Sequence, residues 1–168
     1  MEIYILRHGA AEDRRPGHSD ADRRLTVEGR DKLRRVLEVA RASGVVPPVV
    51  VSSPYVRAFE TAEIAAEMLK SPRPVVTSKA LVPSSSPEAV WQLIRDYSGE
   101  TAVLLAGHEP SLGETASYLL GASRVVIDLK KGALARIDVA AFGIEPRGTL
   151  QWLLTAKLAA ARMVPTGE

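Results

Sequence analysis

Short apolar runs alternate along the chain with longer segments of mixed polarity. Glu2–Leu6 is a mostly apolar run of β-forming residues, typical of a strand buried on both faces. Thr101–Ala106 is strongly apolar and Val49–Val51 is a shorter run of the same kind, so we expect both to be strands. Further short strands are expected at Val75–Val76, Ala80–Val82 and Val125–Leu129.

Between several of these runs, apolar residues recur at the spacing of amphipathic helices. The first such segment has Thr26 as its expected N-cap and ends at Gly44. The second is expected to be capped by Ser53, with Pro54 at its first helical position. Two more helices are predicted, from Ser86-Pro87-Glu88 to about Tyr97 and from Pro110 to Gly121.

The end of the chain has a different pattern, because two β-like segments follow each other directly. Ala133–Val139 and Thr149–Ala156 indicate a hairpin around the loop at 143–148. The alternation of strands and helices before it predicts an α/β fold, a three-layer α/β/α arrangement with a mostly parallel central sheet. The hairpin adds antiparallel strands to that sheet. The length of 168 residues fits one domain, which we expect to span residues 1–168.

The composition is ordinary for a globular protein and excludes several classes of site. Hydrophobic residues make up 46% of the chain and charged residues 25%. There is no cysteine, which excludes disulfides, thiolate catalysis and cysteine-bound metals. The N-terminal segment MEIYILRHG lacks the features of a secretory signal, and no apolar run approaches membrane-spanning length. We therefore expect a cytoplasmic protein without a membrane partner.

Arginines are concentrated in the first quarter of the chain, although the net charge is only +2. Residues 9–25 form an expected polar loop that is longer than usual connections, which suggests a functional role. The arginines indicate either an electropositive mouth that attracts anions or a solvated helix face, which we favour for Arg30, Arg34, Arg35 and Arg41. Nucleic acid is not expected as a partner, because few aromatic residues lie among these arginines and no recognition motif is present.

Basic side chains follow three of the predicted strands at the point where each strand ends. Ligands of open parallel sheets bind beyond the carboxyl ends of the strands, so we expect these side chains to meet at one edge. Helices that begin nearby would direct free N–H groups into the same crevice, which suits an anion. The three segments are Arg7-His8-Gly9, Ser52-Ser53-Pro54 with Arg57, and Gly107-His108-Glu109-Pro110.

Two arginines and two histidines at one edge favour phosphoryl chemistry. Arginine presents a planar fork that matches phosphate oxygens, and a neutral imidazole is a nucleophile that can be phosphorylated. Phosphoryl transfer depends mainly on positioning and charge stabilisation, so we expect no metal or other cofactor. A zinc site built from His8, His18 and His108 is not expected, because no pair of them has typical ligand spacing.

In combination, these motifs resemble the histidine phosphatase, or phosphoglycerate-mutase-like, superfamily. The resemblance extends over nearly the whole chain and implies the phosphoglycerate-mutase-like fold. Within the superfamily, the small size and two segments are similar to the SixA branch of phosphohistidine phosphatases. These segments are Arg23-x-Leu25-Thr26-x-x-Gly29 and Gly107-His108-Glu109-Pro110.

The resemblance also implies roles for individual residues. His8 would attack phosphorus and become phosphorylated, and water would then release phosphate from it. Arg7, Arg57 and His108 would hold the phosphoryl oxygens and stabilise the transition state. Arg23 would add a substrate contact.

One feature of many superfamily members is absent, namely an acidic residue after the third strand that serves as general acid. The segment Leu81–Ser86 contains no carboxylate, as in SixA-like members. A phosphoramidate leaves readily once its nitrogen is protonated, so it makes less demand on an acid. Two alternatives remain open, namely that no residue acts as the acid or that one of four substitutes does: Glu12, Asp13, His18 or Glu109.

These considerations favour a phosphatase that acts on phosphohistidine in proteins. A phosphomonoesterase or pyrophosphatase acting on a small phosphorylated substrate is the enzymatic alternative. A non-catalytic phosphate-binding module is a third hypothesis.

Overall fold

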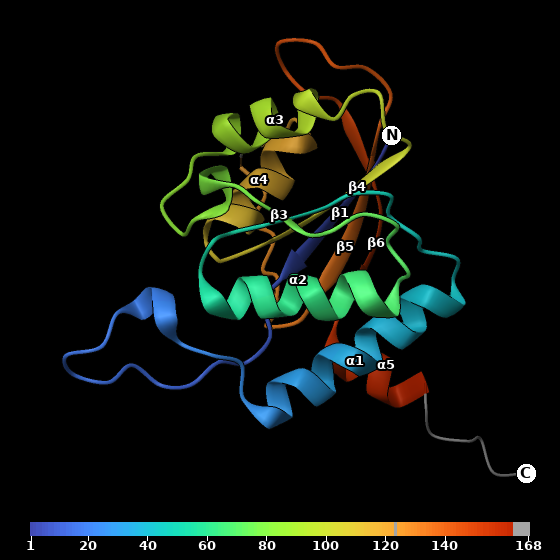
Figure 1. Ribbon diagram of the computed structural model, residues 1–168. Helices are drawn as coiled ribbons and strands as arrows, with labels where there is room; N and C mark the ends of the chain where they lie inside the picture. The colour runs from blue at the N-terminus through green and yellow to red at the C-terminus, as the bar shows by residue number, and fades with distance from the viewer. Residues whose placement is uncertain (123, 163–168) are drawn as a thin grey trace, which may run out of the picture.

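The structure, a computed structural model, describes residues 1–122 and 124–162, within which a single six-stranded sheet crosses the molecule (Figure 1). The strands are β1 (Glu2–Arg7), β2 (Val50–Ser52), β3 (Val76–Thr77), β4 (Ala102–Gly107), β5 (Leu134–Val139) and β6 (Gly148–Leu154). The helices are α1 (Val27–Ala42), α2 (Val56–Met68), α3 (Pro87–Asp96), α4 (Ser111–Leu119) and α5 (Ala156–Arg162), with short 3-10 helices η1 (Asp20–Asp22) and η2 (Lys79–Leu81).

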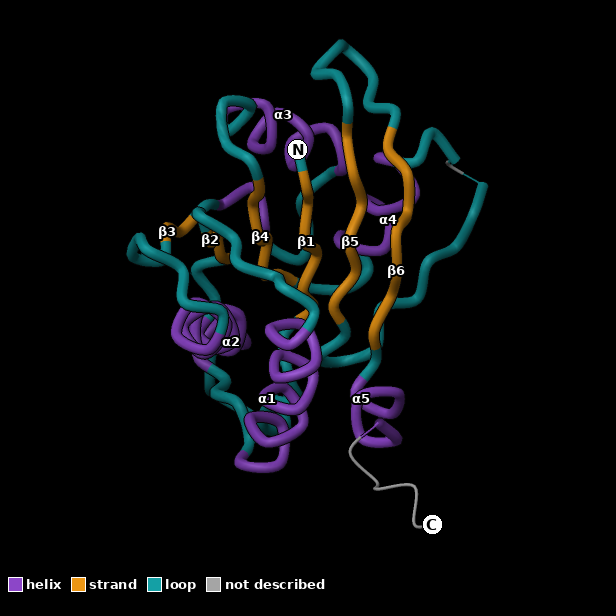
Figure 2. Tube along the Cα trace, turned by 90° about the vertical axis from the view of Figure 1, so that its right-hand side faces the viewer, coloured by secondary structure: helices purple, strands orange, loops and turns teal. Residues whose placement is uncertain are grey.

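The strand order is β3-β2-β4-β1-β5-β6, which Figure 2 shows across the sheet. β1 pairs in parallel with β4, which pairs in parallel with β2, so that Tyr4 and Val50 both lie opposite Leu104. On its other side β1 is antiparallel to β5, and β5 forms the terminal hairpin with β6. The sequence prediction of a mostly parallel sheet extended by an antiparallel hairpin is therefore confirmed.

Different helices cover the two faces of the sheet. Along β1, Ile3 and Ile5 belong to the core cluster under α3 and α4, whereas Tyr4 and Leu6 belong to the cluster under α1 and α2. This alternation follows from the two-residue period of a strand. Figure 1 shows α3 and α4 on one side of the sheet and α1, α2 and α5 on the other. The predicted three-layer α/β/α architecture is confirmed.

The first helix begins where its capping residue indicated, but the second does not. Thr26 caps α1 by accepting a hydrogen bond from the Gly29 amide at 3.0 Å. α2 starts at Val56 and has Tyr55 as its N-cap, without a side-chain cap. The prediction of Ser53 as that cap is wrong, because its hydroxyl contacts the Tyr55 amide at 3.3 Å in the turn before the helix.

Two of the predicted strands do not form. Ala80–Val82 falls mainly in η2, where the side chain of Ser78 accepts a hydrogen bond from the Ala80 amide at 3.2 Å and Leu81 is buried. Val125–Leu129 is irregular, because side chains rather than a neighbouring strand bind its last backbone groups. The predicted strand Thr149–Ala156 ends earlier, since α5 begins at Ala156.

α5 itself was not predicted from the sequence. It packs against α1, and its Ala159 is fully buried in the cluster under α1 and α2. Within the described ranges, every helix falls short of the length and apolar character that a membrane crossing requires.

Candidate active site

Backbone hydrogen bonds join the three sequence motifs at the carboxyl edge of the parallel strands. The His8 amide donates to the carbonyl of Gly107 at 3.0 Å, and the Ser53 amide donates to the carbonyl of Ala106 at 2.9 Å. Because β4 lies between β1 and β2, the loops that follow these three strands start side by side. The sheet thus places both histidines and the turn before α2 around one crevice, as expected from the sequence.

His8 has the tautomer that a nucleophile requires. Its Nδ1 lies 2.7 Å from the carbonyl oxygen of Gly9, which can only accept a hydrogen bond. Nδ1 therefore carries the hydrogen, and Nε2 has the free lone pair. The Nε of Arg57 donates to this Nε2 at 3.2 Å. An imidazole with an available lone pair beside a guanidinium group can attack phosphorus.

The surroundings of His8 keep its ring neutral. Burial lowers the pKa of His8 from 6.5 to about 4, because a charged imidazolium is poorly solvated there. The positive charges of Arg57, Arg7 and Lys131 lower this pKa further, while the hydrogen bond to Gly9 opposes the shift. His8 is therefore a neutral imidazole at pH 7.

The ring of His108 lies beside that of His8, with their centroids 5.0 Å apart and their planes at 60°. The Nε2 of His108 is 2.9 Å from the hydroxyl oxygen of Ser53, and the Tyr55 ring packs edge-on against it at 5.0 Å. Burial lowers the pKa of His108 to about 3, and the positive charge of Arg57 lowers it further. This second imidazole is therefore neutral and fixed in orientation.

Arg57 reaches the crevice from the first turn of α2 and is only 3% exposed. Its guanidinium packs over the ring of Tyr55, 5.1 Å from the centroid, in a cation–π contact. It also binds Asp20 twice, donating from Nη1 to the backbone carbonyl at 2.6 Å and from Nη2 to the carboxylate at 3.0 Å. Each of the three nitrogens of Arg57 therefore donates to His8 or to Asp20.

Two nitrogen atoms in this crevice are buried without a hydrogen-bond partner. They are Nε of Arg7 and Nδ1 of His108, and the described residues contain only one other such side-chain atom. The Nη1 of Arg7 donates to the carbonyl of Leu129 at 2.6 Å, which holds the guanidinium in place. Buried polar atoms normally have partners, so these two nitrogens are free to bind an anionic ligand.

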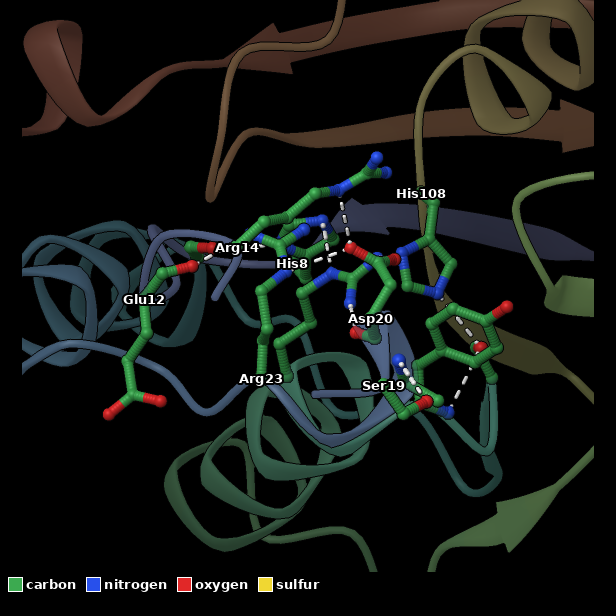
Figure 3. A network of polar contacts seen from close by, with 12 residues as sticks. His8, Glu12, Arg14, Ser19, Asp20, Arg23 and His108 are labelled. Atoms are coloured by element: carbon green, nitrogen blue, oxygen red, sulfur yellow. Dashed lines mark hydrogen bonds and ion pairs between the residues drawn. The ribbon is translucent and has the colours of Figure 1, made fainter. Parts of the chain in front are cut away.

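Asp20 connects the crevice to the polar loop that precedes α1. Its carboxylate accepts from Nε of Arg23 at 2.9 Å and from Nε of Arg14 at 2.9 Å, in addition to Arg57. Figure 3 shows Asp20 among these cationic side chains, next to His8 and His108. The sequence analysis did not single out Asp20, because it is one of several acids in a polar loop. One signal could have indicated Asp20: it lies three residues before Arg23, to which the resemblance assigns a substrate contact.

Arg23 lies at the edge of this group rather than against the histidines. Besides its ion pair with Asp20, its Nη1 donates to the backbone carbonyl of Glu12 at 2.7 Å. Arg23 thus joins both ends of the loop.

The four residues that the sequence left open as acids lie outside the group around His8. The carboxylate of Glu12 turns away from Asp20 in Figure 3, and Asp13 and His18 are exposed in the loop. Glu109 is bound to the amide of Leu129 at 3.1 Å. Burial raises the pKa of Glu109, against the opposing effect of that hydrogen bond.

Within residues 1–122 and 124–162, no group of three or more histidine, aspartate or glutamate side chains is placed to hold a metal ion. Together, the geometry provides a neutral imidazole surrounded by cationic and neutral donors, which suits a tetrahedral anion.

Sequence comparisons agree with the motif resemblance. The model of the histidine phosphatase superfamily (branch 1) matches residues 3–82. An uncharacterised protein of Picosynechococcus is 34% identical over 137 residues, which cover 80% of this chain and 82% of that protein. The phosphohistidine phosphatase SixA of Escherichia coli is 30% identical over 126 residues, which cover 71% of this chain and 74% of SixA.

Structural comparisons point in the same direction. A solved structure of the protein histidine phosphatase SixA complexed with tungstate matches with a TM-score of 0.84 and 26% identity, covering 94% of this chain and 98% of that one. A mycobacterial glucosyl-3-phosphoglycerate phosphatase matches with a TM-score of 0.69 and 16% identity over 89% of this chain and 96% of that one, a likeness of fold alone. The chain therefore belongs to the histidine phosphatase superfamily and is of the SixA type, which supports phosphatase activity.

Proposed function

We propose that this protein removes phosphoryl groups from phosphohistidine in proteins, through a phosphorylated intermediate on His8. The observation that carries the proposal is the state of the His8 ring, which is neutral and buried, with its free lone pair at Nε2. That lone pair lies beside the guanidinium of Arg57. A nucleophile that attacks a charged phosphoryl group requires this arrangement.

In the proposed reaction, the lone pair of His8 Nε2 forms a bond to phosphorus as the bond to the leaving group breaks. The positive charge that develops on the ring is stabilised through Nδ1–H, which donates to the carbonyl of Gly9. The Nε–H of Arg57 is then free to turn from His8 to a phosphoryl oxygen. Water attacks phosphorus in the second half of the reaction, releasing phosphate and restoring the lone pair.

Three side chains form the proposed phosphate cradle, namely Arg7, Arg57 and His108. The hydroxyl of Ser53 accepts from the Tyr55 amide, so its own hydrogen can be donated to Nε2 of His108. That assignment leaves the hydrogen of His108 on Nδ1, the buried atom without a partner. Nδ1 of His108 and Nε of Arg7 are thus two donors for the phosphoryl oxygens, and neither has a partner within the described chain.

The preference for phosphohistidine rests on the segment after β3 and on similarity. The residues from 82 to 86 offer no carboxylate to protonate a demanding oxygen leaving group, whereas a phosphoramidate nitrogen is protonated more easily. The E. coli relative is named as a phosphohistidine phosphatase. The expected partner is therefore a phosphorylated protein, and metal independence and a cytoplasmic location belong to the same proposal.

A phosphocarrier protein with radiolabelled phosphohistidine provides the direct test. Wild-type protein is expected to release phosphate, and an acid quench is expected to trap an acid-labile phosphoenzyme that His8→Ala does not form. EDTA is expected to leave the rate unchanged. Rapid turnover of a sugar phosphate without release from phosphohistidine would reject the substrate class, and labelling of the His8→Ala variant would reject the nucleophile.

A further inference from the structure

Asp20 binds the same guanidinium group that the proposed function assigns to the substrate. Its carboxylate lies 3.0 Å from Nη2 of Arg57, and it also pairs with Arg14 and Arg23. Arginine binds carboxylate and phosphate with the same fork of donors. An incoming phosphoryl group must therefore compete with Asp20 for Arg57.

The loop that carries Asp20 has space for such a displacement. A cavity of about 230 Å³ is lined by Asp20 together with Ser19, His18 and three arginines of the loop, Arg14, Arg15 and Arg23. η1 is only three residues long, and its cap is a 3.2 Å hydrogen bond between the Ser19 hydroxyl and the amide of Ala21. Little packing energy opposes a rotation of the Asp20 side chain, because η1 buries no residue.

We propose that Asp20 is a catalytic residue, which the phosphoryl group displaces from Arg57 and which then donates a proton to the leaving atom. This inference rests on the proposed function, in which His8 attacks phosphorus. It supplies a general acid from the loop before α1 rather than from the segment after β3, and a phosphoramidate nitrogen also needs a proton when it leaves. It also gives the ion pair of the free enzyme a second role, because Asp20 keeps Arg57 in position until substrate arrives.

The proton and electron balance of the two steps is complete. In the first step the His8 lone pair forms the N–P bond, the leaving atom takes the electron pair of its bond to phosphorus, and it accepts the proton of the Asp20 carboxyl group. In the second step a water oxygen bonds to phosphorus and gives a proton to the Asp20 carboxylate. The electron pair of the N–P bond returns to His8, and phosphate leaves.

The protonation state of Asp20 depends on whether Arg57 binds Asp20 or the phosphoryl group. In the free enzyme, burial favours the neutral acid, but Arg57, Arg23 and Arg14 outweigh it and hold the pKa of Asp20 below its usual range. A phosphoryl group that takes over Arg57 removes part of that support and brings negative charge close to Asp20. Both changes raise the affinity of the carboxylate for a proton. Two neutral histidines, His8 and His108, face the same space and add no charge.

Leaving-group dependence distinguishes an acid from a residue that only positions Arg57. 4-Nitrophenyl phosphate and phenyl phosphate differ chiefly in how strongly their leaving oxygen needs a proton. Asp20→Asn should lower kcat/KM for phenyl phosphate by ~10²-fold or more and for 4-nitrophenyl phosphate by less than about tenfold. The matched control is Asp22→Asn, because Asp22 is exposed in the same η1 and should leave both rates at the wild-type level. Equal losses on both esters, or no loss, would overturn the assignment.

The displacement itself has a separate measurement. Tungstate is a tetrahedral oxyanion that needs no proton transfer, so its Kd reports the competition for Arg57 alone. We expect Asp20→Asn to bind tungstate several-fold more tightly than wild type, and unchanged or weaker binding would contradict the displacement. Failure of the His8 mechanism remains distinguishable, because it would abolish phosphoenzyme formation without any dependence on Asp20.

Discussion

The Nε of Arg57 lies 3.2 Å from Nε2 of His8, so the guanidinium donates directly to the atom assigned as nucleophile. This contact joins the first turn of α2 to the end of β1 and holds the imidazole in place. The same donor can turn to a phosphoryl oxygen, where it can stabilise the negative charge of the phosphoryl group in the transition state.

Removal of this guanidinium should affect the transition state more than the fold. Arg57→Ala is expected to cost about 2–4 kcal/mol of transition-state stabilisation, roughly a 30-fold to 10³-fold loss in kcat/KM. Arg57→Lys should retain part of the rate, because it keeps the charge but not the planar fork. Single-turnover kinetics with a phosphohistidine substrate measure this. Arg34→Ala, which removes an exposed arginine on α1, is the control, and an Arg57→Ala rate equal to that of the control would remove Arg57 from the site.

Ser53 should act through His108 and not on the substrate itself. Its hydroxyl lies 2.9 Å from Nε2 of His108, and loss of such a hydrogen bond is worth about 1 kcal/mol. Ser53→Ala is therefore expected to reduce kcat about fivefold with little change in KM. Ser52→Ala is the matched control, because Ser52 is equally buried and its hydroxyl donates to a backbone carbonyl instead. A larger loss in the control variant would contradict this role.

The two buried histidines should make stability depend on pH. The pKa of His8 is lowered from 6.5 to about 4 and that of His108 to about 3. Between these values and 6.5 the unfolded chain binds protons that the native chain does not, so the free energy of unfolding falls as the pH falls through that window. At ~1.4 kcal/mol per pKa unit, His8 alone accounts for a fall in the free energy of unfolding on the order of 3 kcal/mol across its window.

Urea unfolding at a series of pH values from neutral to 4.5 measures this dependence. His8→Gln should flatten it, since the variant has no imidazole to protonate in the unfolded chain. His18→Gln changes an exposed loop residue and should keep the wild-type slope. A His8→Gln protein with the full wild-type dependence would show that this ring is not the origin of the effect.

The convergence of His8, Arg57 and His108 could be predicted because topology decides it. Each follows a strand, and a parallel sheet brings such ends to one edge whatever the loops do. Asp20 could not be predicted in this way. Its contact with Arg57 spans 37 positions and depends on how a polar loop folds back, which has no periodic pattern.

The errors in the fold have similar physical origins. The run Val125–Leu129 is apolar like a strand, but its final N–H and C=O groups bind the side chains of Glu109 and Arg7. Hydropathy does not distinguish a backbone satisfied by side chains from one satisfied by a neighbouring strand. α5 was missed because its apolar pattern is weak: the small residue Ala159 is buried, whereas the larger Leu158 is exposed.

The close packing of α1 against the loop after His8 gives a final prediction, which concerns Gly29. The amide of Thr26 donates to the carbonyl of Ala10 at 3.0 Å, which fixes that loop on the first turn of the helix. A Cβ at Gly29 would lie 2.2 Å from the Ala10 oxygen, and backbone must move to accommodate it. Overpacking of this kind costs about 1–3 kcal/mol.

Gly29→Ala should therefore lower the free energy of unfolding by about that amount and also slow phosphoenzyme formation, because Ala10 is only two residues beyond the nucleophile. Gly99→Ala is the matched control, since a Cβ there meets no atom within 4 Å, and its stability should stay within about 0.5 kcal/mol of wild type. Urea denaturation and acid-quench labelling measure the two effects. Stability and labelling unchanged in Gly29→Ala would mean that α1 does not support the loop that positions His8.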